Sequence, residues 1–188
     1  AYIITAFGGF LGLFVVGGLL DVSAVVDPVV LSVGSVLAAA TAVYTAFLFS
    51  QSKGRDLWQS PAMPLHMLTQ AFVAGAAVTA LIGLGGFDEL IGPSRLVLAG
   101  GLVVHLGLVA SELFTPHQTE DAEEAAARIA RGRFSTAFWG GGIVVGIALP
   151  LAALALSAAP VVVALAGVAA LVGLFAFEYC WITAPQTI

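Results

Sequence analysis

The stretch RLVLAGGLVVHLGLVASELFT, residues 95–115, decides the fold, because it is apolar and long enough to cross a bilayer, which takes about 20 residues. It carries two ionisable side chains, His105 and Glu112. They lie seven residues apart, so both fall on one helix face, roughly 10 Å apart along the axis. An ionisable group at that depth is costly unless it faces protein or water, so this face predicts a functional site inside a helix bundle.

The composition is that of an integral membrane protein. Of the 188 residues, 60% are hydrophobic and 9% are charged, against about 25% charged in a soluble domain. The net charge of −5 and the absence of a basic patch exclude nucleic acid as a partner. The lipid bilayer is the partner that the composition indicates. Cys180 is the only cysteine, so this chain can hold no iron–sulfur cluster, and we expect no covalently bound or metal-ligated cofactor in it.

Hydropathy predicts an all-α, polytopic transmembrane bundle that forms one unit over residues 1–188. Because the linkers are short, neighbouring helices run up and down. The sequence opens with Ala1 and is apolar at once, which does not fit a signal peptide, so we expect the natural chain to have earlier residues. The predicted spans are 1–20, 28–50, 61–86, 95–115, 134–157 and 159–183.

Small residues and prolines predict details of these helices. Gly8 with Gly12, and Gly142 with Gly146, recur at a spacing of four and predict close helix contacts. Pro150 lies inside the fifth span and predicts a kink, because it leaves a carbonyl without its donor. Ahead of the third span, Ser60 is a candidate N-cap, with Pro61 at the first helical position and Pro64 still in the first turn.

One segment reads as soluble. Residues 119–131 predict a short amphipathic surface helix with Thr119 as its N-cap and Glu124 paired with Arg128 one turn later. Acidic residues near its positive N-terminal end favour the helix, and Gly132 can end it. The alternative is that this segment is a docking surface, although a charge run is most often only a solvated face.

We define side A as the face that holds the start of the first span, the 51–60 and 116–133 loops and the C-terminus. Five of the six basic residues lie there and only Arg95 lies on the other side, so the positive-inside rule predicts that side A is cytoplasmic. All three tryptophans also lie near side A, which indicates that side A meets something besides lipid. The candidate docking residues are Trp58, Arg128, Arg131, Arg133 and Trp139.

Polar residues inside the spans gather toward side A as well. Any one of them alone is most simply an interhelical hydrogen bond. Together they predict a water-accessible half-channel that ends in a pocket, in which carboxylates and imidazoles pass protons. Those within about two turns of side A are Tyr44, His66, Gln70, Glu112 and Glu178, and His105 lies deeper.

Two other functions stay open. A haem b anchor needs two axial histidines at similar depth, whereas helix rise places His66 about 6 Å and His105 about 15 Å from side A, which disfavours haem. A secondary transporter or channel is the main alternative. It predicts internal repeats and interrupted helices, of which the sequence offers only the Pro150 kink.

Three segments resemble the NrfD-like family of polysulfide reductase membrane subunits: YTAFLFSQSKGRDLWQSPAMPLHML, SELFTPHQTEDAEEAAARIARGRFSTAFWGGGIVVGIALPL and FEYCWITAPQTI. The shared features are a tryptophan that enters a helix after a polar loop, a glutamate that closes the next helix, a Phe-Trp pair before a Gly-rich helix that ends at proline, and a last helix that runs into Ala-Gly-Gln. They span about residues 44–188. Here they are Trp58, Glu112, Phe138 with Trp139, Gly146 with Pro150, and Ala184-Pro185-Gln186.

The resemblance implies a quinone-reactive subunit of a respiratory complex with no redox cofactor of its own. It implies an iron–sulfur partner subunit, commonly a molybdopterin catalytic subunit beyond it, and a place in the inner membrane with the partner on either face. Members typically have eight or more helices, so the six predicted here imply that the family's first two helices are absent or divergent.

The resemblance and the side-A cluster together give the expected site residues. Tyr44 is similar to the family's tyrosine that hydrogen-bonds the quinone head group, and we expect His66 and Gln70 beside it. The quinone is an exchangeable menaquinone or ubiquinone. We expect Glu112, His105 and Glu178 to transfer protons.

Overall fold

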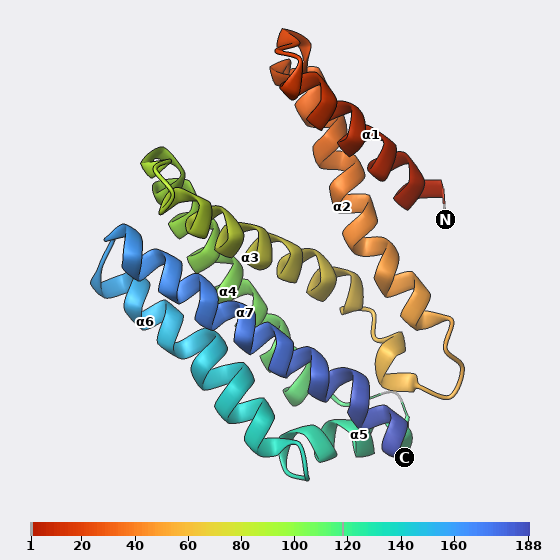
Figure 1. The fold of residues 1–188 in the computed structure, drawn as a ribbon. Helices are drawn as coiled ribbons and strands as arrows, with labels where there is room; N and C mark the ends of the chain where they lie inside the picture. The colour runs from red at the N-terminus through yellow and green to blue at the C-terminus, as the bar shows by residue number, and fades with distance from the viewer. Residues whose placement is uncertain (1, 118) are drawn as a thin grey trace.

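The computed structural model describes residues 2–117 and 119–188, so Ala1 of the first predicted span and Gln118 lie outside the described residues. Within them the chain is helical and contains no strand, and six helices are long and apolar enough to cross a membrane (Figure 1). The predicted fold class is confirmed. The long elements are α1 (Tyr2–Leu19), α2 (Pro28–Ser50), α3 (Met63–Gly83), α4 (Ile91–Phe114), α5 (Glu120–Ala130), the π-helix η4 (Ala137–Ala148) continued by α6 (Leu149–Leu156), and α7 (Pro160–Thr183). The short 3-10 turns are η1 (Ser23–Val26), η2 (Asp56–Gln59), η3 (Asp88–Leu90) and η5 (Ala184–Thr187).

The helix starts differ from the predicted ones where proline is present. α4 begins at Ile91, four residues before the predicted start at 95, because Pro93 falls in the first turn, where its missing N–H costs no hydrogen bond. Arg95 therefore lies inside α4. Its Nε and Nη2 donate to the Leu154 carbonyl at 3.1 and 2.7 Å, and so cap the C-terminal end of α6.

The third span, in contrast to the fourth, starts later than predicted. α3 begins at Met63 rather than at residue 61, with Pro64 in its first turn as expected. Ser60 is not the N-cap of the α-helix. Its Oγ accepts the Ala62 N–H at 3.2 Å in the turn that precedes α3.

The fifth span does not simply kink at Pro150. Residues Ala137–Ala148 form a π-helix, in which each N–H bonds five residues back, and an α-helix follows from Leu149. The Leu149 N–H donates to the Val144 carbonyl, the last bond in this register. The change of register therefore falls at the proline, which cannot donate a bond in either register.

Glycines bring α7 against two neighbours. Gly146 of η4 and Gly173 of α7 meet backbone to backbone, and a Cβ at Gly167 would lie 3.0 Å from the Cα of Ala77 in α3. Close contact was expected at Gly142 and Gly146, and both face α7.

The same expectation is wrong for Gly8 and Gly12. A Cβ at either position would have no described atom within 4 Å. α1 packs on α2 through another face, where the Phe10 ring fills the space beside Gly34. The glycine-bearing face of α1 therefore takes no part in helix contacts among the described residues.

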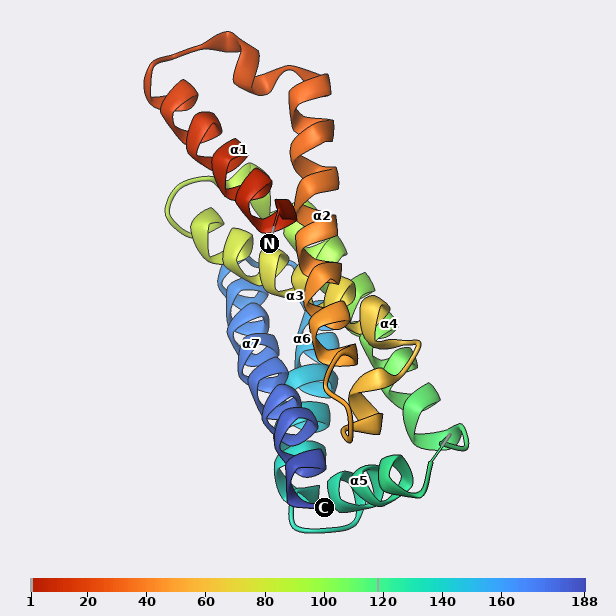
Figure 2. The ribbon, with the colours of Figure 1, turned by 90° about the vertical axis from the view of Figure 1, so that its right-hand side faces the viewer.

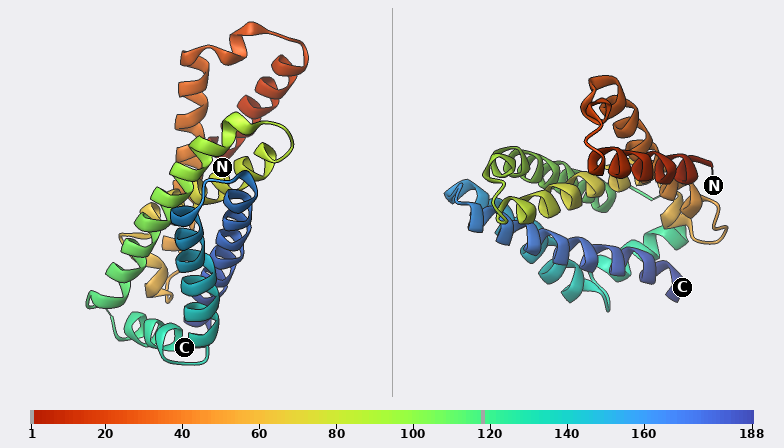
Figure 3. Two further views of the ribbon diagram at one scale, coloured as in Figure 1. Left: turned by 90° about the vertical axis from the view of Figure 1, so that its left-hand side faces the viewer. Right: turned by 45° about the horizontal axis from the view of Figure 1, so that its top comes forward.

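Four spans form the core of the bundle. α3, α4, η4 with α6, and α7 lie side by side, whereas the α1–α2 hairpin stands away from them and joins through α2 along α3 (Figure 2; Figure 3, right). α5 crosses the side-A end of the bundle (Figure 3, left). Its apolar face, with Ala125 and Ile129 buried, packs on that end, and Thr119 caps it by accepting the Ala122 N–H at 3.3 Å. The predicted surface helix, 119–131, is thus a lid on the bundle end over residues 120–130.

Candidate functional site

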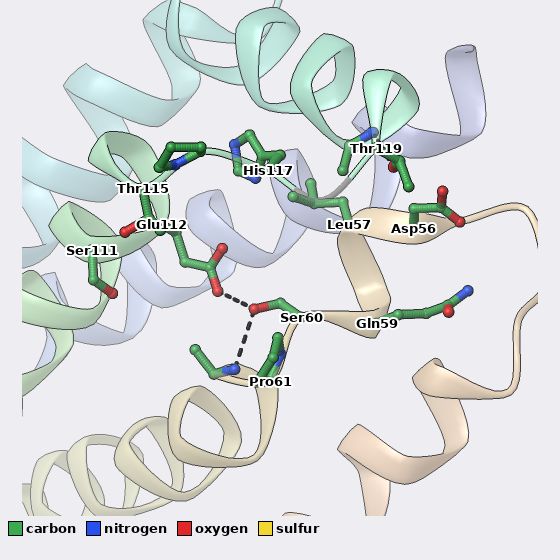
Figure 4. A pocket seen from close by; sticks show the side chains of 13 residues that line it. Asp56, Leu57, Gln59, Ser60, Pro61, Ser111, Glu112, Thr115, His117 and Thr119 are labelled. Carbon is green, nitrogen blue, oxygen red and sulfur yellow. Dashed lines mark hydrogen bonds between the residues drawn. The ribbon is translucent and has the colours of Figure 1, made fainter.

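A cavity of about 360 Å³ opens at side A, where η2 and the start of α3 face the end of α4 and the start of α5 (Figure 4). We call it the end cavity. Most of its lining side chains carry oxygen or nitrogen, so a ligand in the cavity meets several hydrogen-bonding groups. It is lined by Asp56, Leu57, Gln59, Ser60, Pro61, Ala62, Ser111, Glu112, Thr115, Pro116, His117, Thr119 and Ala122.

Glu112 is the buried carboxyl group of the end cavity. Its residue exposure is only 8%, and it lies in the last turn of α4, next to the carbonyl end of the helix, which does not favour a negative charge. The Ser60 hydroxyl donates to Glu112 Oε1 while it accepts the Ala62 N–H, so the serine is held from both sides (Figure 4). Asp56 and His117 line the same cavity. This arrangement can take a hydrogen-bond donor and accept its proton.

A second group of side chains lies deeper in the bundle. The rings of His66 and His105 are each 1% exposed, and their centroids lie 5.7 Å apart, edge to face. The ring of Phe177 in α7 packs on both imidazoles, with its centroid 5.7 Å from that of His66 and 4.9 Å from that of His105. Trp181 lies 5.8 Å from His66, and Phe138 of η4 lies 6.3 Å from Phe177. We call these five residues the imidazole cluster.

The predicted difference in depth between the two histidines is wrong. The Ser60–Glu112 hydrogen bond sets the register of the antiparallel helices α3 and α4. His66, six residues after Ser60, therefore comes level with His105, seven residues before Glu112. The loop ends from which depth was counted do not mark one plane. The difference in depth therefore no longer argues against haem, because the two imidazole rings lie 5.7 Å apart, centroid to centroid.

Gln70 and Glu178 form a third polar contact. Gln70 is one turn beyond His66 on α3, Glu178 follows Phe177 on α7, and the two half-buried side chains are neighbours. The two side chains interact with each other, and Gln70 Nε2 and Glu178 Oε1 are shielded from solvent. Tyr44 is half-buried on α2 and does not line the end cavity.

The structure thus brings the predicted polar residues together in pairs rather than in one pocket. His66 meets His105, and Gln70 meets Glu178. Glu112 lies about two turns of α4 from His105, in the end cavity, and both are buried on one helix face, as their spacing implies.

Two of the expected docking residues have partners inside the chain. The Trp58 indole N–H donates to the Trp181 carbonyl at 3.1 Å, which ties η2 to the end of α7. Arg128 donates to Glu124 within α5 and to the carbonyl and hydroxyl oxygens of Thr187. These two side chains hold the side-A end of the bundle together.

The other three expected docking residues face outward. Arg131 and Arg133 are exposed, and the Arg133 guanidinium lies 4.8 Å above the Phe134 ring. Trp139 is 44% exposed although its N–H donates to the Ala130 carbonyl at 2.8 Å. Arg131, Arg133 and Trp139 therefore remain available to a partner at this edge.

Sequence reasoning missed several residues of the site. Ser60 was expected only as a helix cap, and Asp56 and His117 of the end cavity were not singled out. Phe177 was not considered, although its spacing of four from Trp181 places two large aromatic rings on one face of α7. A spacing of four predicts that the two rings pack on one helix face. It does not predict that they pack against histidines.

A scan of protein families matches the family described as "Polysulphide reductase, NrfD" over residues 11–188. Comparison with curated proteins and with solved structures finds no match. The family match extends the resemblance from residues 44–188 to the second half of α1 and all later elements, and it agrees with the six apolar spans of a multi-pass membrane protein. The chain therefore belongs to the polysulphide reductase NrfD family, whose members are membrane subunits of oxidoreductase complexes and partner with iron–sulfur and catalytic subunits.

Proposed function

We propose that this chain is the quinone-binding membrane anchor of a respiratory oxidoreductase complex. It exchanges electrons between an exchangeable menaquinone or ubiquinone and an iron–sulfur partner subunit, beyond which lies a molybdopterin catalytic subunit. The observation that carries the proposal is the end cavity, in which a buried carboxyl group, Glu112, faces a space large enough for a ligand head group.

The chemistry follows from the lining of the end cavity. A quinol that gives up two electrons also releases two protons, and an acceptor positioned at the hydroxyl speeds that release. Glu112 can accept one of these protons, and the second can pass to His117 or Asp56, which line the same cavity. The Ser60 hydroxyl holds the carboxyl group in place. The protein supplies position and electrostatics, and the redox chemistry belongs to the quinone.

Tyr44 and Gln70 are the second candidate contacts for the head group. They lie on α2 and α3, which pack together, and both are half-buried, as a group at the wall of a lipid-facing site must be. His66 is enclosed by Phe177, His105 and Trp181, so its role is inside the bundle rather than at the quinone. His105 and Glu178 are the proposed inner stations for protons.

The partner subunit is proposed to dock at side A. The end cavity opens there, and Arg131, Arg133 and Trp139 are exposed beyond the other end of α5. The positive-inside bias supports a cytoplasmic side A, and the proposed complex implies the inner membrane.

The test compares Glu112→Gln and Tyr44→Phe in the assembled complex. We expect quinol-coupled turnover to fall by about 10²-fold or more in Glu112→Gln, while activity with an artificial soluble electron carrier stays intact. Ser111→Ala is the matched control, because Ser111 lines the same cavity but bonds its own helix at the Leu108 carbonyl. If quinol-coupled turnover falls in Tyr44→Phe but not in Glu112→Gln, the head group binds on the α2–α3 side instead of in the end cavity.

Equal loss of both activities contradicts the proposal, since it indicates a role in assembly. The two alternatives have their own readouts. A haem anchor shows a visible absorption band in the purified chain, and a transporter shows substrate flux in liposomes without partner subunits.

A further inference from the structure

The imidazole cluster contains polar atoms that packing alone does not explain. Nδ1 and Nε2 of His66, Nδ1 of His105 and Nε1 of Trp181 are all shielded from solvent, and none has a hydrogen-bond partner among the described residues. The three side chains are 1%, 1% and 5% exposed, and they come from three different helices, α3, α4 and α7. The His105 and Trp181 rings both neighbour His66, at centroid distances of 5.7 and 5.8 Å, so the unpaired nitrogens belong to one group of adjacent rings inside the bundle.

Unpaired nitrogens at such a position are costly. A buried donor or acceptor without a partner destabilises the fold by the full free energy of its desolvation. Four such groups in one cluster would cancel a large share of a domain's stability. Native proteins meet this need with ordered water, which typically makes two to four hydrogen bonds to groups of this kind.

We propose that His66, His105 and Trp181 bind an internal water molecule. A neutral imidazole offers one donor and one acceptor, and an indole offers a donor only, so the ligand must both accept and donate hydrogen bonds. Water does both and is small enough to lie among these rings. Two bonds of about 2.9 Å at a tetrahedral angle let one water join nitrogens about 4.7 Å apart, a separation within reach of rings whose centroids lie 5.7 and 5.8 Å apart.

The other tryptophans show that this site is specific. The indole N–H groups of Trp58 and Trp139 each donate to a backbone carbonyl, at 3.1 and 2.8 Å. Trp181 is the tryptophan whose N–H lacks such an acceptor in the described part of the chain. The proposed water gives it one.

The water site concerns the hydration of the chain alone and needs neither quinone nor a partner subunit. Its use as a station for protons between Glu112 and Glu178 rests on the proposed function. The experiment below measures hydration directly, so failure of the quinone proposal leaves its result unchanged.

The experiment is water-to-protein polarisation transfer in solid-state NMR, on the full chain in liposomes with ¹⁵N-labelled histidine and tryptophan. The chain has three histidines and three tryptophans, and single replacements by phenylalanine assign each signal. His117 lines the open end cavity and is the internal standard for contact with water. We expect His66, His105 and Trp181 to receive water magnetisation at mixing times within about threefold of His117.

The proposal is overturned if only His117 and the exposed Trp139 respond while the cluster nitrogens stay silent at tenfold longer mixing. A variant sharpens the result. His105→Phe removes a ligand of the water and should lower the transfer to Trp181 at least threefold. Phe138→Leu, in the same cluster but without a polar atom, should not change it, and equal loss in both variants also refutes the site. If His105→Phe fails to fold, the wild-type measurement still decides.

Discussion

A single methyl group at Gly173 should push α7 away from η4. An ideal Cβ there would overlap the Cα of Gly146 and lie 2.8 Å from its backbone nitrogen and 3.1 Å from its carbonyl carbon, whereas nonbonded carbon atoms are most stable at about 3.5–4.0 Å. The obstacle is backbone, which cannot rotate away as a side chain can. In Gly173→Ala the helices must separate by an amount on the order of 1 Å.

The expected cost is that of overpacking, about 1–3 kcal/mol, although glycine to alanine inside a helix otherwise gains about 0.5–1 kcal/mol. In a chain of this size that loss lowers the unfolding temperature by roughly 2–12 °C, which circular dichroism in detergent resolves. Gly140→Ala is the matched control: it lies in η4, and a Cβ there meets no described atom within 4 Å. Equal melting of the two variants would refute the backbone contact between η4 and α7.

Three further substitutions test contacts at the two ends of the bundle. Ser60→Ala removes the hydroxyl that holds Glu112, so we expect a loss of about 1 kcal/mol and slower quinol oxidation, with Ser60→Thr retaining both. Trp58→Phe removes the hydrogen bond from η2 to α7, and faster proteolysis of the 51–60 loop should report it; an unchanged rate would show that ring packing alone holds the loop. Arg95→Gln removes the cation that caps α6 at Leu154, at a cost of about 1 kcal/mol by thermal unfolding, and a melting temperature equal to wild type would argue against the cap.

The spans could be predicted because their signal is local. Length and hydropathy alone define a segment that must be helical in lipid, and the predicted starts shift by no more than four residues, at α3 and α4 where Pro64 and Pro93 sit inside a first turn and at η4 where no proline does. The π-helix could not be predicted in this way. Its residues, Ala137–Ala148, are as apolar as those of any other span, and the change of register arises from packing of Gly146 on Gly173 together with the proline that follows.

The site was predictable in its parts but not in its assembly. The spacing of His105 and Glu112 gives a shared face from the helix period, and both are buried. Which side chain meets which depends on the register of α3 against α4, and that register depends on how the 51–60 loop folds back to bring Ser60 to Glu112. No periodicity in the sequence carries this information, so His66 was placed too shallow relative to His105.

The dependence of the imidazole cluster on α7 has a consequence for biogenesis. His105 leaves the ribosome 72 residues before Phe177, the ring that contacts both histidines, and at typical rates of synthesis that interval lasts about 4–14 s. Throughout it, α3 and α4 stand in the lipid with two imidazoles that nothing yet covers. We expect the translocon or a membrane chaperone to retain this half-built pair until the last helix arrives, so that nascent chains truncated before residue 177 crosslink to it and full-length chains are released.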